Sequence, residues 1–136
     1  MAEEFKKRAL PSVWAKNLAK LLGGDNRCWY AAWMQAQYWV PREEQTPEDR
    51  ERMAGHMRAH DAITARRAAE LRAEGFTVKV EDEGAFKVKG KTAELTGKPD
   101  IVALLSGDAL VVDAKSGKRR EGDAWQVLVY MFALPL

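Results

Sequence analysis

The stretch GKPDIVALLSGDALVVDAKSG, residues 97–117, predicts a β-hairpin. It carries acids at positions where core residues are expected. Two apolar runs, residues 101–105 and 109–112, lie on either side of Ser106-Gly107. A short pair with glycine between two such runs is typical of a two-residue hairpin turn.

The turn determines which residues of the hairpin face one another. If Ser106 and Gly107 are the two loop residues, Asp100 lies directly opposite Asp113, whereas a loop longer or shorter by one residue would put the two acids on opposite faces. Two facing carboxylates repel each other unless something neutralises them, and a divalent cation with oxygen ligands would do so.

Lys115 is the third chemically informative residue of the hairpin. It lies two residues after Asp113 on one strand, so both side chains project from the same face. The alternative interpretation is that Asp100 is a turn residue after Pro99 and that Asp113 and Lys115 form an ordinary salt bridge.

The remaining elements are predicted from periodicity and from capping residues. Ser12 is a plausible N-cap for a first helix, and Asp25 or Asn26 for a second. The predicted helices cover residues 12–22, 28–40, 47–74 and 123–134, and the β-rich runs cover residues 76–81, 85–90, 100–105 and 109–116. EDEG and KTAELTGKP are interpreted as connections, and the last helix, apolar nearly all round, as buried. Helices, then a small sheet of hairpins, then a helix indicate an α+β fold.

Composition limits the class of protein. The 136 residues predict a single domain, 1–136, with an N-terminal aromatic helical region over 1–45 and the remaining core over 46–136. The 22 Lys+Arg against 20 Asp+Glu give a net charge of +2, which excludes a broadly polycationic nucleic-acid coat protein. Cys28 is the one cysteine, so no intrachain disulfide can form. With neither a transmembrane run nor a signal-peptide core, we expect a cytoplasmic protein without a membrane partner.

The hairpin carries a family resemblance. Pro99-Asp100 followed by Asp113-Ala114-Lys115 resembles the motif of the PD-(D/E)xK nuclease superfamily. DAKSGK and the later Gln126 to Tyr130, a Q-x-x-x-Y motif, are similar to the RecB-like branch, which includes CRISPR-adaptation-associated and phage exonucleases. The resemblance implies a restriction-endonuclease-like core, a small mixed sheet with a catalytic hairpin flanked by helices.

The resemblance also implies roles for individual residues. Asp100, Asp113, a histidine and the backbone carbonyl of Ala114 would hold Mg²⁺ or Mn²⁺. Lys115 would position the attacking hydroxide, and Gln126 and Tyr130, at i and i+4, could both reach back to the sheet. Four following residues could grip DNA phosphates or form only a solvated basic turn, namely Ser116, Lys118, Arg119 and Arg120.

Two histidines compete for the metal-ligand position. His60 falls in the middle of an apolar stripe formed by Met53, Met57 and Leu71, whereas His56 lies at its margin. We therefore favour His60 and keep His56 as the alternative. A satisfied core or surface histidine is the interpretation without a metal.

The N-terminal aromatic residues have two interpretations. Trp29, Tyr30, Trp33, Tyr38 and Trp39 could stack on unpaired bases, but an aromatic stripe on a helix is more often core, and we favour the core. Cys28 precedes the aromatic helix. In the CRISPR-associated relatives, a cysteine at such a place joins three others to bind an iron–sulfur cluster. Because such a cluster needs four thiolates, no iron–sulfur cluster is expected in this chain.

The function implied by the resemblance is divalent-metal-dependent hydrolysis of DNA phosphodiester bonds in a bacterial, archaeal or phage-infected cell, by an exonuclease. A structure-specific endonuclease and a non-catalytic DNA-binding subunit on a nuclease fold are the alternatives. The sequence leaves open the oligomeric state and any protein partner.

Overall fold

The computed structural model describes residues 5–135, which form two compact units. The first unit comprises residues 5–42, 86–97 and 120–135, and the second comprises residues 43–85 and 98–119. Residues 1–4 and 136, which the predicted domain 1–136 includes, lie outside the described part. That the chain is one domain stays a prediction.

Helix α3 (Pro47–Ala73) begins the second unit where the sequence predicted it. The Thr46 hydroxyl accepts a hydrogen bond from the Asp49 backbone N–H at 3.1 Å, and the Asp49 carboxylate accepts one from the Thr46 backbone N–H at 3.3 Å. This reciprocal capping box satisfies two of the amides that a helix start leaves unpaired, and Pro47 suits the first turn because it lacks an N–H.

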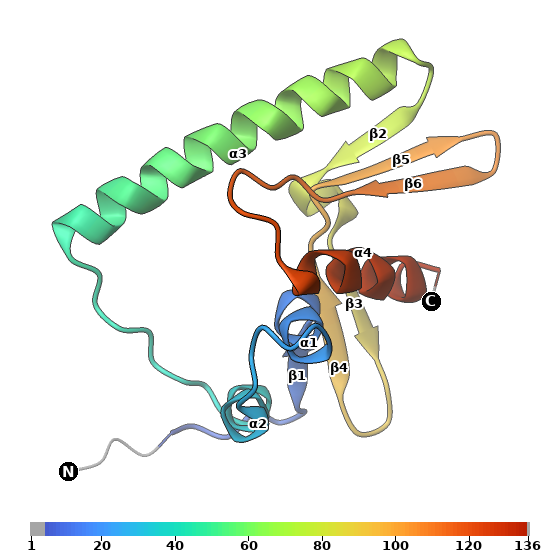
Figure 1. The fold of residues 1–136 in the computed structure, drawn as a ribbon. Helices are drawn as coiled ribbons and strands as arrows, with labels where there is room; N and C mark the ends of the chain where they lie inside the picture. Colours follow the sequence, from blue (N-terminus) through green and yellow to red (C-terminus); the bar gives the residue numbers. More distant parts are fainter. Residues whose placement is uncertain (1–4, 136) are drawn as a thin grey trace. The chain divides into compact units, whose positions relative to one another are not determined.

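Three antiparallel strands complete the second unit in the order β2-β5-β6, with α3 alongside them (Figure 1). Their bounds are Thr77–Val80 for β2, Ile101–Leu105 for β5 and Asp108–Val112 for β6, and a short 3₁₀ turn, η1 (Glu81–Gly84), follows β2. Ile101 pairs with Val112 and Leu105 with Asp108, so the predicted hairpin register is confirmed. Ser106 and Gly107 have φ values of 48° and 86°, the left-handed pair that a tight hairpin turn requires.

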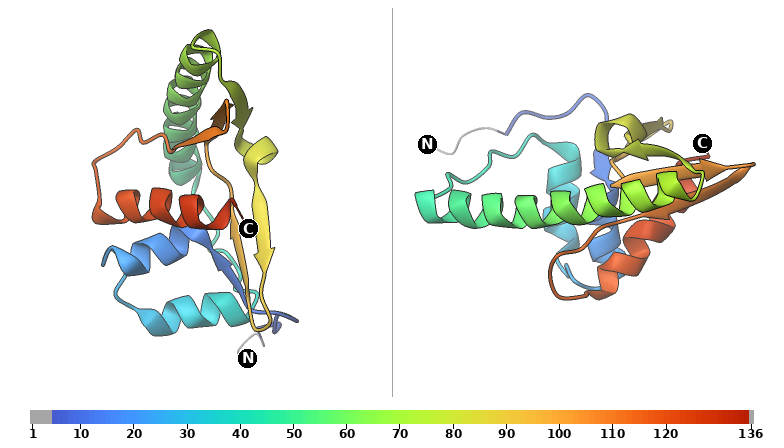
Figure 2. Two further views of the ribbon diagram at one scale, coloured as in Figure 1. Left: turned by 90° about the vertical axis from the view of Figure 1, so that its right-hand side faces the viewer. Right: turned by 90° about the horizontal axis from the view of Figure 1, so that it is seen from above.

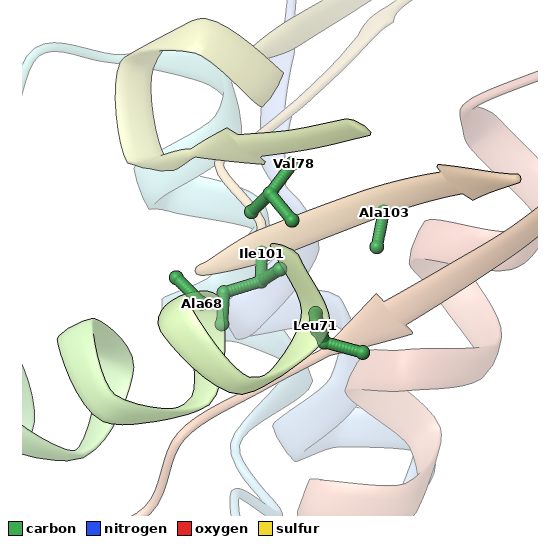
Figure 3. Packing of buried hydrophobic residues seen from close by; sticks show 5 residues of the cluster. All are labelled: Ala68, Leu71, Val78, Ile101 and Ala103. Atoms are coloured by element: carbon green, nitrogen blue, oxygen red, sulfur yellow. The ribbon is translucent and has the colours of Figure 1, made fainter. Parts of the chain in front are cut away.

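The core of the second unit lies between α3 and the sheet. Ala68 and Leu71 from α3 pack against Val78 of β2 and against Ile101 and Ala103 of β5 (Figure 3). Leu71, Ile101 and Ala103 have no exposed surface. This packing holds the start of β5 against the helix, one residue after Asp100.

The first unit contains a second, mixed sheet in the order β1-β4-β3. Strand β1 (Ser12–Trp14) runs parallel to β4 (Glu94–Gly97), and β3 (Phe86–Lys89) runs antiparallel to β4. Strand β4 falls in the segment that the sequence assigned to a connection, so that assignment was wrong. Within residues 5–135 the strands therefore form two three-stranded sheets and not one small sheet of hairpins.

Helices α1 (Ala15–Leu22) and α4 (Glu121–Ala133) pack side by side in the first unit (Figure 2). A β-carbon on Gly23 would lie 2.6 Å from the backbone nitrogen of Gly122, so the two backbones approach too closely for any side chain at that point. The Asp25 carboxylate accepts a hydrogen bond from the same Gly122 nitrogen at 2.9 Å. Asp25 therefore joins the two helices.

The structure corrects three details of the predicted helices. Ser12 is the first residue of β1 and not an N-cap, because the chain pairs with β4 before it turns into α1. Helix α2 (Trp29–Gln37) is shorter than predicted, and its N-cap is Cys28, whose sulfur accepts a hydrogen bond from the Ala31 N–H at 3.4 Å. Helix α4 is buried on one side only, since Phe132 is 70% exposed.

The α+β class and its restriction-endonuclease-like organisation are confirmed, with small sheets and four helices. Among the described residues, no helix is both long enough and apolar enough to cross a membrane.

Candidate active site

The open end of the β5–β6 hairpin brings two acids together. Asp100 immediately precedes β5 and Asp113 immediately follows β6, so the confirmed register makes them the next facing positions of the ladder. The Asp100 Oδ2 atom accepts a hydrogen bond from the Ala114 backbone N–H at 2.7 Å. The Asp100 and Asp113 side chains are only 14% and 6% exposed, so both carboxylates are largely withdrawn from water.

Helix α3 contributes a histidine to this end of the hairpin. The His60 Nε2 atom lies 3.1 Å from Asp100 Oδ2. His60 precedes the buried residues Thr64 and Ala68 at intervals of four along α3, so the face that packs on the sheet also carries the imidazole to Asp100. His56, one turn earlier, is exposed.

Lys115 lies beside the second acid. Its Nζ atom is 2.6 Å from Asp113 Oδ2, so the predicted shared face of these two side chains is confirmed. The Lys115 side chain is 37% exposed, which leaves the ammonium group within reach of a molecule in solvent.

Burial and neighbouring charged groups change the pKa values of two site residues. Burial raises the pKa of Asp113 to about 6; Lys115 opposes this, and the negative charge of Asp100 adds to it. Burial by itself would lower the pKa of His60, but its contacts with Asp100 and Asp61 outweigh burial and raise that pKa above 6.5. Burial, more than the charge of Asp100, therefore disfavours the ionised form of Asp113.

We expect Asp113→Asn to stabilise the metal-free protein near neutral pH. Because the pKa of Asp113 is higher in the folded state, its contribution to stability is complete below about pH 3.8 and is lost as the pH rises through about 6. Each pKa unit corresponds to about 1.4 kcal/mol, and solvent screens part of this, so the variant should gain about 1 to 3 kcal/mol near pH 7.5. Urea unfolding in the presence of a chelator measures the difference.

The same measurement near pH 4 should show a much smaller gain, because the wild-type carboxyl is then largely protonated like the neutral amide. Asp108→Asn is the matched control, because Asp108 is an exposed acid at the far end of the same strand. An Asp113→Asn variant that is no more stable than the wild type near pH 7.5 would contradict the raised pKa of Asp113.

The residues at this end of the hairpin fit a divalent cation. Two largely buried carboxylates and one imidazole nitrogen form an oxygen-rich donor set with a borderline nitrogen, as Mg²⁺ and Mn²⁺ accept. Ala114 is buried beside them, and its N–H is the group that contacts Asp100.

Two acids near His60, Asp61 and Glu81, were not predicted from the sequence. One ligand atom from each of His60, Asp61 and Glu81 lies within 4.8 Å of the other two, and His60 Nδ1 is 3.6 Å from Asp61 Oδ1. Glu81 has a left-handed φ of 50°, and its backbone N–H donates to the Asp100 carbonyl oxygen at 3.0 Å. Glu81 comes to the site through the pairing of β2 with β5, and no local pattern predicts that register.

The remaining predicted site residues are divided between the two units. Ser116, Lys118 and Arg119 are exposed in the second unit after Lys115. Arg120 begins the last segment of the first unit, and its backbone N–H donates to the Asp123 carboxylate at 2.8 Å at the start of α4.

Gln126 and Tyr130 lie on the buried face of α4 in the first unit, 7% and 3% exposed. The Gln126 amide donates to the Tyr130 hydroxyl at 3.0 Å, and the Tyr130 ring packs edge-on against Phe86 of β3. A β-carbon on Gly97 would come within 2.9 Å of the Tyr130 ring, so glycine at the end of β4 makes room for it. Tyr130 therefore contacts the β1-β4-β3 sheet, and that Gln126 and Tyr130 reach the sheet of the hairpin stays a prediction.

Comparison with known proteins agrees with the geometry of the hairpin end. The family model described as the PD-(D/E)XK nuclease superfamily matches residues 1–135. Neither the curated proteins nor the solved structures yield a match. Since the family match spans nearly the whole chain, and the acids and lysine of the motif meet at one end of a hairpin, the chain belongs to the PD-(D/E)XK nuclease superfamily.

Proposed function

We propose that this nuclease is a divalent-metal-dependent deoxyribonuclease of the RecB-like type that digests DNA from its ends. The observation that carries the proposal is that His60 Nε2 lies 3.1 Å from Asp100 Oδ2 while Asp113 faces Asp100 across the hairpin, so donors from three separate segments are neighbours. Without a cation this arrangement places two carboxylates where they repel each other.

In the proposed site, His60 Nε2, the two carboxylates and the carbonyl oxygen of Ala114 hold Mg²⁺ or Mn²⁺. A divalent cation, when bound, lowers the pKa of a water ligand and neutralises negative charge on the phosphate. We keep His56 as the second choice for the imidazole, but its exposure and its place one turn before His60 argue against it.

Lys115 has a distinct role in the proposed reaction. Asp113 holds its ammonium group at 2.6 Å, so the positive charge is fixed before the substrate arrives. With a cation bound by the carboxylates, the ammonium group would orient the attacking hydroxide and stabilise the negative charge of the transition state. Ser116, Lys118, Arg119 and Arg120 contact flanking phosphates.

The exonuclease assignment rests on the Gln126 to Tyr130 motif. These two residues hydrogen-bond to each other and are held by Phe86 and by the space at Gly97, so they form a fixed polar pair on α4. By their resemblance to the Q-x-x-x-Y motif, we assign them to the positioning of the DNA strand.

The test compares linear and covalently closed circular forms of the same plasmid with Mn²⁺ or Mg²⁺. We expect the linear DNA to be degraded progressively and the circle to stay intact, and a chelator should stop degradation. The Asp113→Ala protein, purified in parallel, controls for contaminating nucleases. Nicking of the circle at the same rate as digestion of the linear form would contradict the exonuclease assignment and favour an endonuclease.

A further inference from the structure

The aromatic residues of α2 lie at the surface, which contradicts the core interpretation favoured by the sequence. No residue of α2 is buried, and Trp29 and Tyr30 are 64% and 70% exposed. Trp33 and Trp39 are exposed as well. We call these four residues, Trp29, Tyr30, Trp33 and Trp39, the aromatic patch.

The rings of this patch contact one another and do not fill a core. Tyr30 stacks on Trp33 with ring centres 5.9 Å apart and an interplanar angle of 26°. Trp33 meets Tyr38 edge-on at 6.2 Å. Ring faces that remain open to water at this level of exposure are available for stacking with planar groups from outside.

A basic segment lies beside the C-terminal end of α2. The Arg8 N–H donates to the Gln37 carbonyl and the Trp39 N–H donates to the Lys6 carbonyl, both at 2.8 Å, so the two segments pair antiparallel (Figure 1). The Arg8 guanidinium lies 3.8 Å above the centre of the Trp39 ring, a cation–π contact. A cationic side chain therefore contacts a ring of the aromatic patch directly.

The charge of the surrounding sequence is strongly one-sided. Between Phe5 and Arg42 the only acid is Asp25, and its carboxylate accepts a hydrogen bond from Gly122. Seven basic residues lie in the same stretch: Lys6, Lys7, Arg8, Lys16, Lys20, Arg27 and Arg42. This local charge is much more positive than the net +2 of the whole chain.

We propose that the aromatic patch and the Lys6–Arg8 segment bind unpaired DNA, with bases stacked on the rings and phosphates held by the cations. This inference rests on the proposed function and specifies its substrate as a DNA strand with single-stranded character. Exposed rings interleaved with cations are the combination that binds single strands without base-specific contacts. Duplex DNA would use the cations but not the rings, because its bases are already stacked.

Charge decides between DNA and a second copy of this chain. In a symmetric dimer the same patch faces itself, so Arg8 on the Trp39 ring and its neighbours Lys6 and Lys7 would face the same cations of the second copy. A phosphate backbone brings the opposite charge to the same surface.

The experiment measures binding to fluorescein-labelled dT20 and to a 20-base-pair duplex by fluorescence anisotropy. The 136-residue chain carries Asp113→Ala and a chelator is present, so that no DNA is cut. We expect dT20 to bind more tightly than the duplex. Combined Trp29→Ala and Tyr30→Ala should weaken dT20 binding by about tenfold or more.

Two variants separate stacking from a general loss of surface. Trp29→Phe with Tyr30→Phe keeps aromatic rings and should retain most of the affinity for dT20. Phe132→Ala is the matched control, because Phe132 is also 70% exposed but lies on α4, and it should leave the affinity unchanged. Thermal unfolding verifies that each variant is folded.

Arg8→Gln should lower the salt dependence of dT20 binding by about one unit in the slope of log affinity against log salt. Affinity for dT20 that does not change in the double alanine variant overturns the proposal. Dissociation of a dimer by that variant, with dT20 affinity unchanged, overturns it in favour of a second copy.

Failure of the stacking proposal can be distinguished from failure of the proposed nuclease function. If the wild-type protein degrades linear DNA while the alanine variant binds dT20 normally, only the stacking proposal fails. If the wild-type protein neither binds nor degrades any DNA, the proposed function fails as well.

Discussion

Asp113→Ala is expected to reduce metal-dependent hydrolysis of linear DNA by about a thousandfold or more. The Asp113 side chain is nearly fully buried and faces Asp100, so its removal takes away one of two carboxylates that would hold the cation. A bound metal contributes several kcal/mol of transition-state stabilisation, and each 1.4 kcal/mol corresponds to about tenfold in rate. Release of acid-soluble nucleotides from labelled linear DNA, with Mn²⁺ in excess, measures the loss.

Asp108→Ala is the matched control for this loss. Asp108 is the same residue type on the same strand, but it is exposed beside the hairpin turn. Its substitution should leave the rate within about twofold of wild type, since surface changes away from special features have small effects. Wild-type activity in a folded Asp113→Ala protein would show that the hydrolytic site lies elsewhere.

Lys115→Ala is expected to reduce the rate by about a hundredfold or more while divalent-cation binding is retained. The ammonium group is held at 2.6 Å from Asp113 and is partly exposed, so it can act on a substrate phosphate. Loss of one preorganised group that stabilises transition-state charge costs about a hundredfold to a thousandfold in kcat. Steady-state kinetics should therefore show a lower kcat with a small change in KM.

Lys79→Ala controls for the loss of one positive charge from the same sheet, because Lys79 is an exposed residue of β2. It should leave kcat unchanged. If Lys115→Ala instead raised KM with kcat unaffected, Lys115 would be a DNA-binding residue and not part of the reaction.

The hairpin could be predicted from the sequence because all of its determinants are local. The apolar runs, the Ser106-Gly107 turn and the spacing of Asp100 and Asp113 lie within 21 consecutive residues, 97–117. A two-residue loop permits one register, and the structure has it. The capped start of α3 is equally local, since Thr46, Pro47 and Asp49 determine it.

Elements that depend on distant partners were not predictable in the same way. Strand β4 contains Leu95 and Thr96 but no long apolar run, and it forms because β3 pairs on one side and β1 on the other. Strand β1 comes from the start of the chain, so no local pattern predicts its parallel pairing. For the same reason Ser12 was taken for a helix cap.

The histidine was predicted through a stripe that the structure corrects in part. Met53 and Met57 are about half exposed, so the packed face of α3 is formed by Thr64, Ala68 and Leu71 instead. His60 still lies on that face, one turn before Thr64, and the prediction of its position was correct. Its role as a ligand stays a proposal.

The aromatic helix shows the limit of periodicity. Trp29 and Trp33 have the spacing of a core stripe, yet both are exposed, because α2 has no buried residue. An apolar stripe shows that a face can be covered, but it does not show by what.

The most direct test of the central claim is anomalous diffraction from crystals grown with Mn²⁺. We expect an anomalous peak bound by Asp100 and Asp113, with His60 as the nitrogen ligand at about 2.0 to 2.3 Å, the range for protein ligands of small divalent metals. The peak should be lost in Asp113→Ala crystals. Two results would contradict a cation site at Asp100, Asp113 and His60. One is the absence of a peak between these side chains in well-ordered crystals with Mn²⁺ in excess. The other is a peak held by His56 and other acids.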